Sequence, residues 1–294
     1  HVDTEADKEF SSLMLWSADS SDSRMLTTGK AKDSSPCFAP DGKSIAFLSD
    51  RKEKPQVFIL PLNGGDARQL TDMKQGVGGG PVWSPDGANI AFTAGPGFGD
   101  EDPPDLTKQA YRVNRKVYRF DGVGYLDQKV QDIYVIGAAG GEPKQLTDNR
   151  FNSYDLKWSP DGSRLMFLES MNPDSFRMMQ PVIKIIDMDG MITSPPGDDF
   201  LAQAAEWMPN GKLLAVVGKP DDGSPIGSKN DLWVLDLEDG GLENRTAGLT
   251  VGVGGTLSMR MPAKGLSGIK LLIIDSGDSV YIRVQAGGTV HVYL

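Results

Sequence analysis

Cysteine and histidine are the scarcest chemically reactive side chains in this 294-residue sequence. The one cysteine, Cys37, excludes an internal disulfide and suits a reducing compartment, so we expect a cytoplasmic protein, with the periplasm as the alternative. The two histidines are His1 and His291, and His291 lies in an apolar, strand-like run. A serine nucleophile needs an adjacent base, and these histidines offer no plausible triad. We therefore expect no catalytic residue in this chain.

Long apolar runs and excess positive charge are also missing. No stretch of about 18 apolar residues occurs, so we expect no membrane-spanning helix. The net charge is −10, which argues against nucleic acid or an anionic membrane as the main partner. The densest acidic run, Asp100–Asp102 with Asp105, follows no ligand-spacing rule and indicates a solvated loop, with calcium as the alternative. We expect neither a metal nor another cofactor.

A repeated turn motif is what the sequence has instead. Ser84–Gly87 and Ser159–Gly162 both read SPDG, and near-copies stand at Ala39–Gly42 and Met208–Gly211. The prolines of the four motifs are at positions 40, 85, 160 and 209. Two of the three intervals match the roughly 40–50 residues of one four-stranded propeller blade. Proline fixes φ, aspartate or asparagine bonds its own backbone, and glycine accepts a positive φ, so each motif predicts a turn between two strands.

The residues around each turn also repeat. An aromatic residue precedes the turn, two strand-like apolar runs follow it, and several units close with a glycine-rich turn and Leu-Thr. These features predict an all-β fold, a β-propeller of four-stranded blades with about five to six blades present, from a parent with six or seven. Unrelated hairpins in a sandwich are the alternative. The tryptophans, which recur within the units, are expected in the blade cores: Trp16, Trp83, Trp158, Trp207 and Trp233.

The two ends of the chain carry incomplete units. Leu13–Thr27 resembles the last two strands of a blade, and Lys270–Leu294 supplies about three strands. We expect residues 1–294 to form one propeller domain that is a piece of a longer polypeptide.

An insertion of about residues 95–131 lengthens the unit that begins near Pro85. Its first part is rich in glycine, proline and acid, whereas its second part mixes aromatic and basic residues. One interpretation is a solvated hairpin, and the other is an arm that lines a substrate path or holds a neighbouring domain. In the second case the candidate contact residues are Arg112, Arg115 and Arg119.

The repeat SPDG…IAF…GG…LT resembles the propellers of the prolyl oligopeptidase family of serine peptidases and of TolB-type proteins. The stretch Val117–Thr147, VYRFDGVGYLDQKVQDIYVIGAAGGEPKQLT, is similar to the corresponding part of bacterial acylaminoacyl peptidases. That resemblance implies a propeller followed by a C-terminal α/β-hydrolase domain with a Ser-Asp-His triad and a G-x-S-x-G motif. This chain has no such motif. The nearest run, Gly265–Ile269, lacks the second glycine at the required place, which Ile269 occupies.

The resemblance implies that the chain is a non-catalytic domain that gates the access of short, N-acylated peptides to a catalytic domain outside it. The expected partners are the α/β-hydrolase domain of the same polypeptide and short peptides, and a homo-oligomer is left open. In this interpretation the three arginines bind a peptide carboxylate or contact the hydrolase surface. They could equally pair with nearby acids on an exposed hairpin. A TolB-like propeller that docks other proteins is the alternative function, followed by a propeller enzyme with a metal at its axis.

Overall fold

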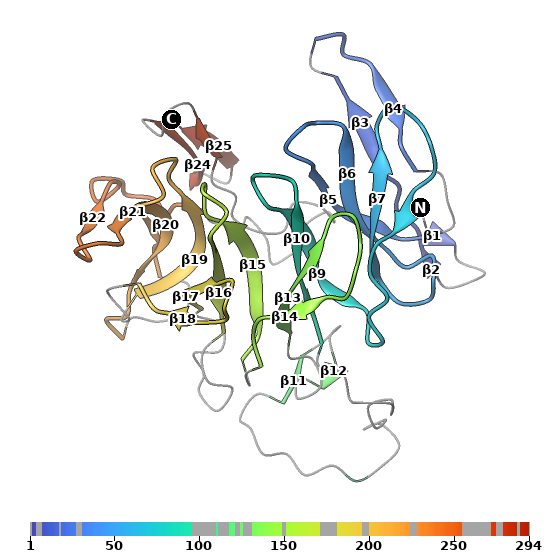
Figure 1. Cartoon of the computed structure of the whole chain (residues 1–294). Coiled ribbons are helices and arrows are strands. Elements are labelled where there is room, and N and C mark those ends of the chain that lie inside the picture. Colours follow the sequence, from blue (N-terminus) through green and yellow to red (C-terminus); the bar gives the residue numbers. More distant parts are fainter. Residues whose placement is uncertain are drawn as a thin grey trace. The chain divides into compact units, whose positions relative to one another are not determined.

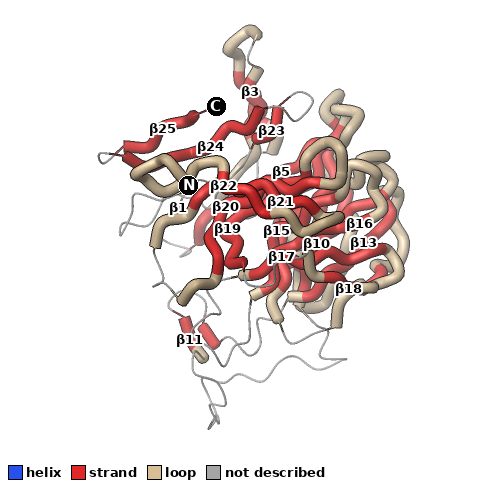
Figure 2. Tube along the Cα trace, turned by 90° about the vertical axis from the view of Figure 1, so that its left-hand side faces the viewer, coloured by secondary structure: helices blue, strands red, loops and turns tan. Residues whose placement is uncertain are grey.

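Every regular element of the described chain is a β-strand (Figure 2). The computed structural model describes residues 2–3, 8–17, 19–27, 31–95, 110, 118–120, 124–125, 131–148, 151–170, 181–195, 200–223, 228–254, 272–274, 279–286 and 289–293. None of these residues belongs to a helix that is long and apolar enough to cross a membrane. The prediction of an all-β fold is confirmed.

The chain, drawn in Figure 1, forms two compact units. The first unit comprises residues 1–114 and 118–156, and the second comprises residues 115–117 and 157–294. Each four-stranded sheet of these units is built from strands that follow one another in the sequence and hydrogen-bond in that order.

The first unit holds two complete four-stranded sheets. The first sheet is β5 (Asp33–Phe38), β6 (Ser44–Ser49), β7 (Gln56–Pro61) and β8 (Arg68–Gln69). The second is β9 (Val77–Trp83), β10 (Asn89–Ala94), β13 (Asp132–Gly137) and β14 (Lys144–Gln145). Both are antiparallel, and the insertion of residues 95–131 lies between the second and third strands of the second sheet.

Two more four-stranded sheets follow. The third is β15 (Ser153–Trp158), β16 (Arg164–Glu169), β17 (Val182–Asp187) and β18 (Ile192–Thr193), and the boundary between the units falls within β15. The fourth is β19 (Phe200–Trp207), β20 (Leu213–Pro220), β21 (Asp231–Asp236) and β22 (Leu242–Asn244). The four repeats thus give four blades, each with its SPDG-type turn between the first and second strands.

Shorter sheets precede and follow these blades. A two-stranded sheet of β3 (Met14–Trp16) and β4 (Ser23–Met25) comes first, and a three-stranded sheet of β23 (Leu272–Ile274), β24 (Ser279–Ala286) and β25 (Thr289–Tyr293) comes last. Two-residue strands form the pairs β1 (Val2–Asp3) with β2 (Lys8–Glu9), and β11 (Arg119–Phe120) with β12 (Gly124–Tyr125). A part-blade, four full blades and a further part-blade agree with the sequence prediction.

Apolar side chains fill the space between neighbouring sheets of one unit. Phe92 and Tyr134 of the second sheet stack with ring centroids 5.7 Å apart and pack with Val57 and Ile59 of the first sheet. In the second unit, Phe200 meets Trp233 edge to face in a cluster shared by the third and fourth sheets. These clusters are the cores that the strand-like apolar runs after each turn predict.

The tryptophans depart from the prediction at one position. Trp207 is buried, and Trp83, Trp158 and Trp233 are partly buried, but Trp16 of β3 is 62% exposed. The prediction of a core position is wrong for Trp16. The corresponding residue of the first complete sheet, Leu60, is buried by Ile45 of the neighbouring strand and by Leu13 of the preceding sheet. Among the described strands β3 has only β4 beside it, so Trp16 lacks the first kind of cover.

Candidate functional site

The aspartates of the SPDG turns bind their own turn. The Ser159 hydroxyl donates to the Asp161 carboxylate at 2.6 Å, and the Ser163 N–H donates to the same oxygen at 3.0 Å. These hydrogen bonds, the serine hydroxyl of Ser159 first, lower the pKa of Asp161 to about 2. Gly162 has a φ of +72°, which glycine adopts without strain.

The turn at Ser84–Gly87 repeats this arrangement. The Ser84 hydroxyl donates to Asp86 at 2.6 Å and lowers the pKa of that carboxyl, with help from the N–H of Ala88. No group of three or more histidine, cysteine or carboxylate side chains able to hold a metal occurs within the described residues. The carboxylates of Asp86 and Asp161 therefore act as hydrogen-bond acceptors within their own turns.

The threonine of the Leu-Thr motif hydrogen-bonds to the start of the third strand of its blade. The Thr147 hydroxyl accepts the N–H of Ile133 at 2.8 Å and donates to the Asp132 carboxylate at 2.9 Å. Thr71 makes the same pair of bonds with Val57 and Gln56, at 2.9 Å each. The same hydroxyl-to-N–H bond joins Thr246 to Leu232 and Thr27 to Leu13. The motif satisfies a buried N–H at the start of the third strand, a role that the sequence did not reveal.

The tryptophan before the turn connects neighbouring blades. The indole N–H of Trp83 donates to the backbone oxygen of Cys37 at 3.2 Å, and that of Trp207 donates to Lys157 at the same distance. Each acceptor stands one residue before the aromatic position of the preceding blade, Phe38 or Trp158. The repeated aromatic is thus a hydrogen-bonding link as well as an apolar side chain.

The first strands of the first two sheets approach each other closely. A Cβ atom placed on Gly80 of β9 would lie 2.8 Å from the Cβ atom of Ser35 on β5, so only glycine fits there. Ser35 has a φ of +52° in a bulged part of β5, and Asp155 of β15, also three residues before its blade's aromatic, has a φ of +53°. Bulges of this kind twist an edge strand and limit pairing with further strands.

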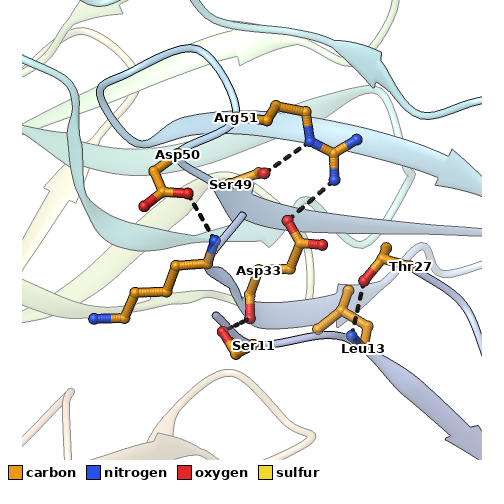
Figure 3. A network of polar contacts seen from close by, with 8 residues as sticks. Ser11, Leu13, Thr27, Asp33, Ser49, Asp50 and Arg51 are labelled. Atoms are coloured by element: carbon orange, nitrogen blue, oxygen red, sulfur yellow. Dashed lines mark hydrogen bonds and ion pairs between the residues drawn. The ribbon is translucent and has the colours of Figure 1, made fainter. Parts of the chain in front are cut away.

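A polar network lies at the start of the first sheet (Figure 3). The buried Asp33 carboxylate pairs with the Arg51 guanidinium at 3.0 Å, and Arg51 also donates to the Ser49 hydroxyl at 2.8 Å. The same guanidinium lies over the rings of Phe58, at 4.7 Å, and Phe47, at 5.3 Å. The Ser11 hydroxyl donates to the backbone oxygen of Asp33 at 2.6 Å. The network joins the segment before β3 to the first complete blade.

The residues predicted for the insertion are mostly outside the described part of the chain. Arg112 and Arg115 lie outside the described residues, as do Asp100–Asp102 and Gly265–Ile269. Arg119 is in β11, which pairs with β12 through Arg119–Tyr125 and Phe120–Gly124. The side chains of Arg119 and of His291 in β25 are not described. The contact role of the three arginines stays a prediction.

Comparison with known proteins gives two groups of relatives in sequence. The TolB beta propeller domain family matches residues 4–99. An uncharacterised peptidase of Bacillus subtilis, YuxL, is 33% identical over 172 residues, which are 56% of this chain and 26% of YuxL. A TolB homolog of Chlorobium luteolum is 50% identical over 46 residues, 16% of this chain and 11% of the relative. The chain thus spans about a quarter of the peptidase and about a tenth of the TolB homolog.

Solved structures give the same two groups. The acylaminoacyl peptidase of Pyrococcus horikoshii superposes with a TM-score of 0.69 at 18% identity, over 99% of this chain and 41% of that one. The propeller of the Pyrococcus furiosus Trilobed protease gives 0.60 at 15% identity, over 99% and 74%. TolB from Acinetobacter baumannii gives 0.52 at 18% identity, over 94% and 57%. The chain is a β-propeller. The predicted resemblance to the propellers of prolyl-oligopeptidase-family peptidases and of TolB is confirmed.

Proposed function

We propose that this propeller is the non-catalytic domain of an acylaminoacyl-peptidase-like serine hydrolase. It gates the access of short N-acylated peptides to an α/β-hydrolase domain of the same polypeptide, in a reducing, cytoplasmic compartment. The observation that carries the proposal is the 33% identity to the peptidase YuxL over 172 residues. The likeness to the P. horikoshii peptidase covers 41% of that chain, which leaves room there for a catalytic domain outside the propeller.

A domain that gates access to an active site must be rigid, and the contacts between neighbouring blades favour rigidity. Within each unit the indole bonds of Trp83 and Trp207 tie a blade to the one before it, and shared apolar clusters fill the space between the sheets. Close-packed interiors of this kind resist deformation. A stiff ring with a narrow passage would admit an extended peptide and exclude a folded protein.

The insertion is the proposed contact with peptide or hydrolase domain. Arg112, Arg115 and Arg119 would pair with a peptide carboxylate or with acidic groups of the hydrolase surface, because guanidinium groups bind carboxylates through two parallel hydrogen bonds. Replacing all three with alanine in the full polypeptide is expected to lower kcat/KM for acylated peptides about tenfold or more. Unchanged kcat/KM with unchanged stability would instead place the arginines on a solvated hairpin.

A TolB-like function is the second candidate. The TolB beta propeller domain family matches residues 4–99, and a TolB homolog reaches 50% identity over 46 residues. In this case the propeller docks other proteins and no hydrolase domain accompanies it.

Labelling with a fluorophosphonate, which reacts with activated serines, separates the two. The full polypeptide is expected to become labelled at one serine outside residues 1–294, and this 294-residue chain alone is expected to stay unlabelled. Absence of labelling in the full polypeptide, together with the retention of protein partners on this chain, would support the TolB-like function. Gel filtration of the same samples tests whether the protein forms a homo-oligomer, which the sequence left open.

A further inference from the structure

An ion pair joins the first strands of the third and fourth sheets. The Lys157 ammonium of β15 lies 3.2 Å from the Glu206 carboxylate of β19, and both residues belong to the second unit. The two side chains are 32% and 27% exposed, so water reaches both. Each residue stands directly before the tryptophan of its strand, Trp158 or Trp207.

The first strands of neighbouring sheets are in direct contact. The indole N–H of Trp207 joins β19 to the backbone of β15, as Trp83 joins β9 to β5 in the first unit. The fourth strands are at the opposite edge of each sheet, and there Ile192 of β18 and Leu242 of β22 are 40% and 36% exposed. Because the blades of a propeller converge towards a central passage, the first strands border that passage.

The side chains of β19 alternate between its two faces. Ala205 and Trp207 are buried in the cluster shared with the third sheet, so Glu206 points to the opposite face, as does Ala204, which packs in a different cluster. The contact from Glu206 back to Lys157 of the third sheet therefore goes around an edge of β19. One edge of β19 pairs with β20, and the other pairs with no strand that the structure describes. The ion pair thus lies at that second edge, on the passage side of the second unit.

The blade repeat does not require charge at this position. In the first unit the same position, directly before the aromatic residue, holds Cys37 in β5 and Val82 in β9, both half-buried. The backbone of Cys37 accepts the Trp83 indole N–H as the backbone of Lys157 accepts that of Trp207. A partly exposed ion pair contributes little to stability. Neither the fold nor its stability therefore explains why this position is charged in the third and fourth blades.

We propose that Lys157 binds the carboxylate of a peptide that enters the passage, and that Glu206 is the positioning residue that holds the ammonium group there. The proposal rests on the proposed function and specifies the charge that the gate selects. An N-acylated peptide has lost the positive charge of its amino end and keeps a carboxylate at its other end. This carboxylate can replace that of Glu206 beside Lys157, in a charge-assisted hydrogen bond. Because the two carboxylates compete, the peptide is held weakly and is released towards the active site.

The first test measures binding to the 294-residue chain by NMR. The probes are N-acetyl-tetra-alanine as the free acid, the same peptide as the C-terminal amide, and an amide whose last residue is glutamate. The ε-methylene signal of Lys157, assigned with Lys157→Met, is expected to shift and saturate with the two carboxylates and not with the uncharged amide. The signal of Lys212, which pairs with Glu238 at 2.8 Å on an exposed surface, should not move. Equal shifts with acid and uncharged amide, or no shift with any probe, would overturn the proposal.

The second test uses kinetics of the full polypeptide with the same acid and uncharged amide. Lys157→Met is expected to lower kcat/KM for the acid about tenfold, with kcat unchanged, and to leave the amide unaffected. Glu206→Gln removes the competing carboxylate and is expected to raise kcat/KM for the acid about threefold, an effect that a merely structural ion pair would not give. Lys212→Met removes the same charge from an exposed pair and is the matched control, with no expected change.

The two tests separate this proposal from the hydrolase assignment. A loss of kcat/KM for acid and amide alike in Lys157→Met and Glu206→Gln, together with lower stability, would make the pair a structural link and overturn the proposal. An unchanged kcat/KM of Lys157→Met for the acid would overturn it as well. If the full polypeptide hydrolyses no acylated peptide, the proposed function fails, and the NMR titration still decides whether Lys157 binds a peptide carboxylate.

Discussion

The indole N–H of Trp207 lies 3.2 Å from the backbone oxygen of Lys157, in the first strand of the preceding sheet. The Arg164 guanidinium lies over the same indole, 5.1 Å from the ring centroid, and donates to the backbone oxygen of Gly211 at 3.3 Å. One buried side chain thus connects two blades of the second unit by a hydrogen bond, a cation–π contact and apolar packing. Trp83 and Cys37 repeat the hydrogen bond in the first unit.

Trp207→Phe should destabilise the second unit, because it removes the hydrogen bond to Lys157 while an aromatic ring remains. The expected loss in the free energy of unfolding is about 1 kcal/mol. Urea denaturation measures it. Trp16→Phe, at a side chain that is 62% exposed, is the control and should change stability by less than about 0.5 kcal/mol. Equal effects of the two substitutions would contradict the role of the indole bond.

Thr147→Val should destabilise the protein more than the similar size of the two side chains suggests. It leaves the buried N–H of Ile133 without its acceptor and removes a donor from the buried Asp132 carboxylate. We expect a loss of about 1–3 kcal/mol, measured by thermal or urea unfolding. Thr147→Ser keeps the hydroxyl and should recover most of the loss. A serine variant as unstable as the valine variant would show that the methyl group matters more than the bonds.

Gly218→Ala should disrupt the fourth sheet. A Cβ atom at this position would lie 2.2 Å from the backbone oxygen of Leu201, and the strand pairing of β19 and β20 prevents that oxygen from moving away. The expected destabilisation is about 1–3 kcal/mol or more. Gly248→Ala is the matched control, since nothing lies within 4 Å of its added Cβ atom. A stability equal to that of the control would mean that β20 is not packed in this register.

Acid should weaken the SPDG turn of the third blade. The pKa of Asp161 is lowered to about 2 from its ordinary 3.8, so its contribution is fully present above pH 3.8 and is lost as the pH falls through about 2. Ser159→Ala removes the main cause and should raise this pKa towards 3.8, which NMR titration of the carboxyl measures. In the corresponding turn of the fourth blade, the amide oxygen of Asn210 accepts the N–H of Lys212. Because an amide does not titrate, this turn is an internal control. An unchanged pKa in Ser159→Ala would contradict the hydrogen-bond explanation.

The blade pattern was predictable because it is local. The turn residues, the apolar runs beside them and the paired glycines after the third strand determine structure over a few residues, and Gly140 and Gly141 do have φ values of +113° and +122°. The contacts across blades were not predictable in the same way. The link from Trp83 to Cys37 joins residues 46 positions apart, and it does not follow from a motif. The ion pair of Asp33 with Arg51, within the first sheet, joins residues 18 positions apart and follows from no motif either.

Two other features needed the structure for a physical reason. In the run GVGGG at residues 76–80, Gly78, Gly79 and Gly80 each lie against a neighbouring side chain that an added Cβ atom would strike. The exposure of Trp16 also escaped prediction, because the burial of a side chain in a repeat depends on neighbouring strands and sheets that the repeat itself does not specify. Both features depend on neighbours distant in the sequence.

The most direct test of the gating role is the dependence of kcat/KM on substrate size in the full polypeptide. Acetylated peptides of increasing length are compared with the same peptide sequence displayed in a loop of a stably folded protein. The account predicts efficient cleavage of the short peptides and a loss of at least about a hundredfold for the folded substrate. Cleavage of the folded substrate at a rate like that of the free peptides would contradict it.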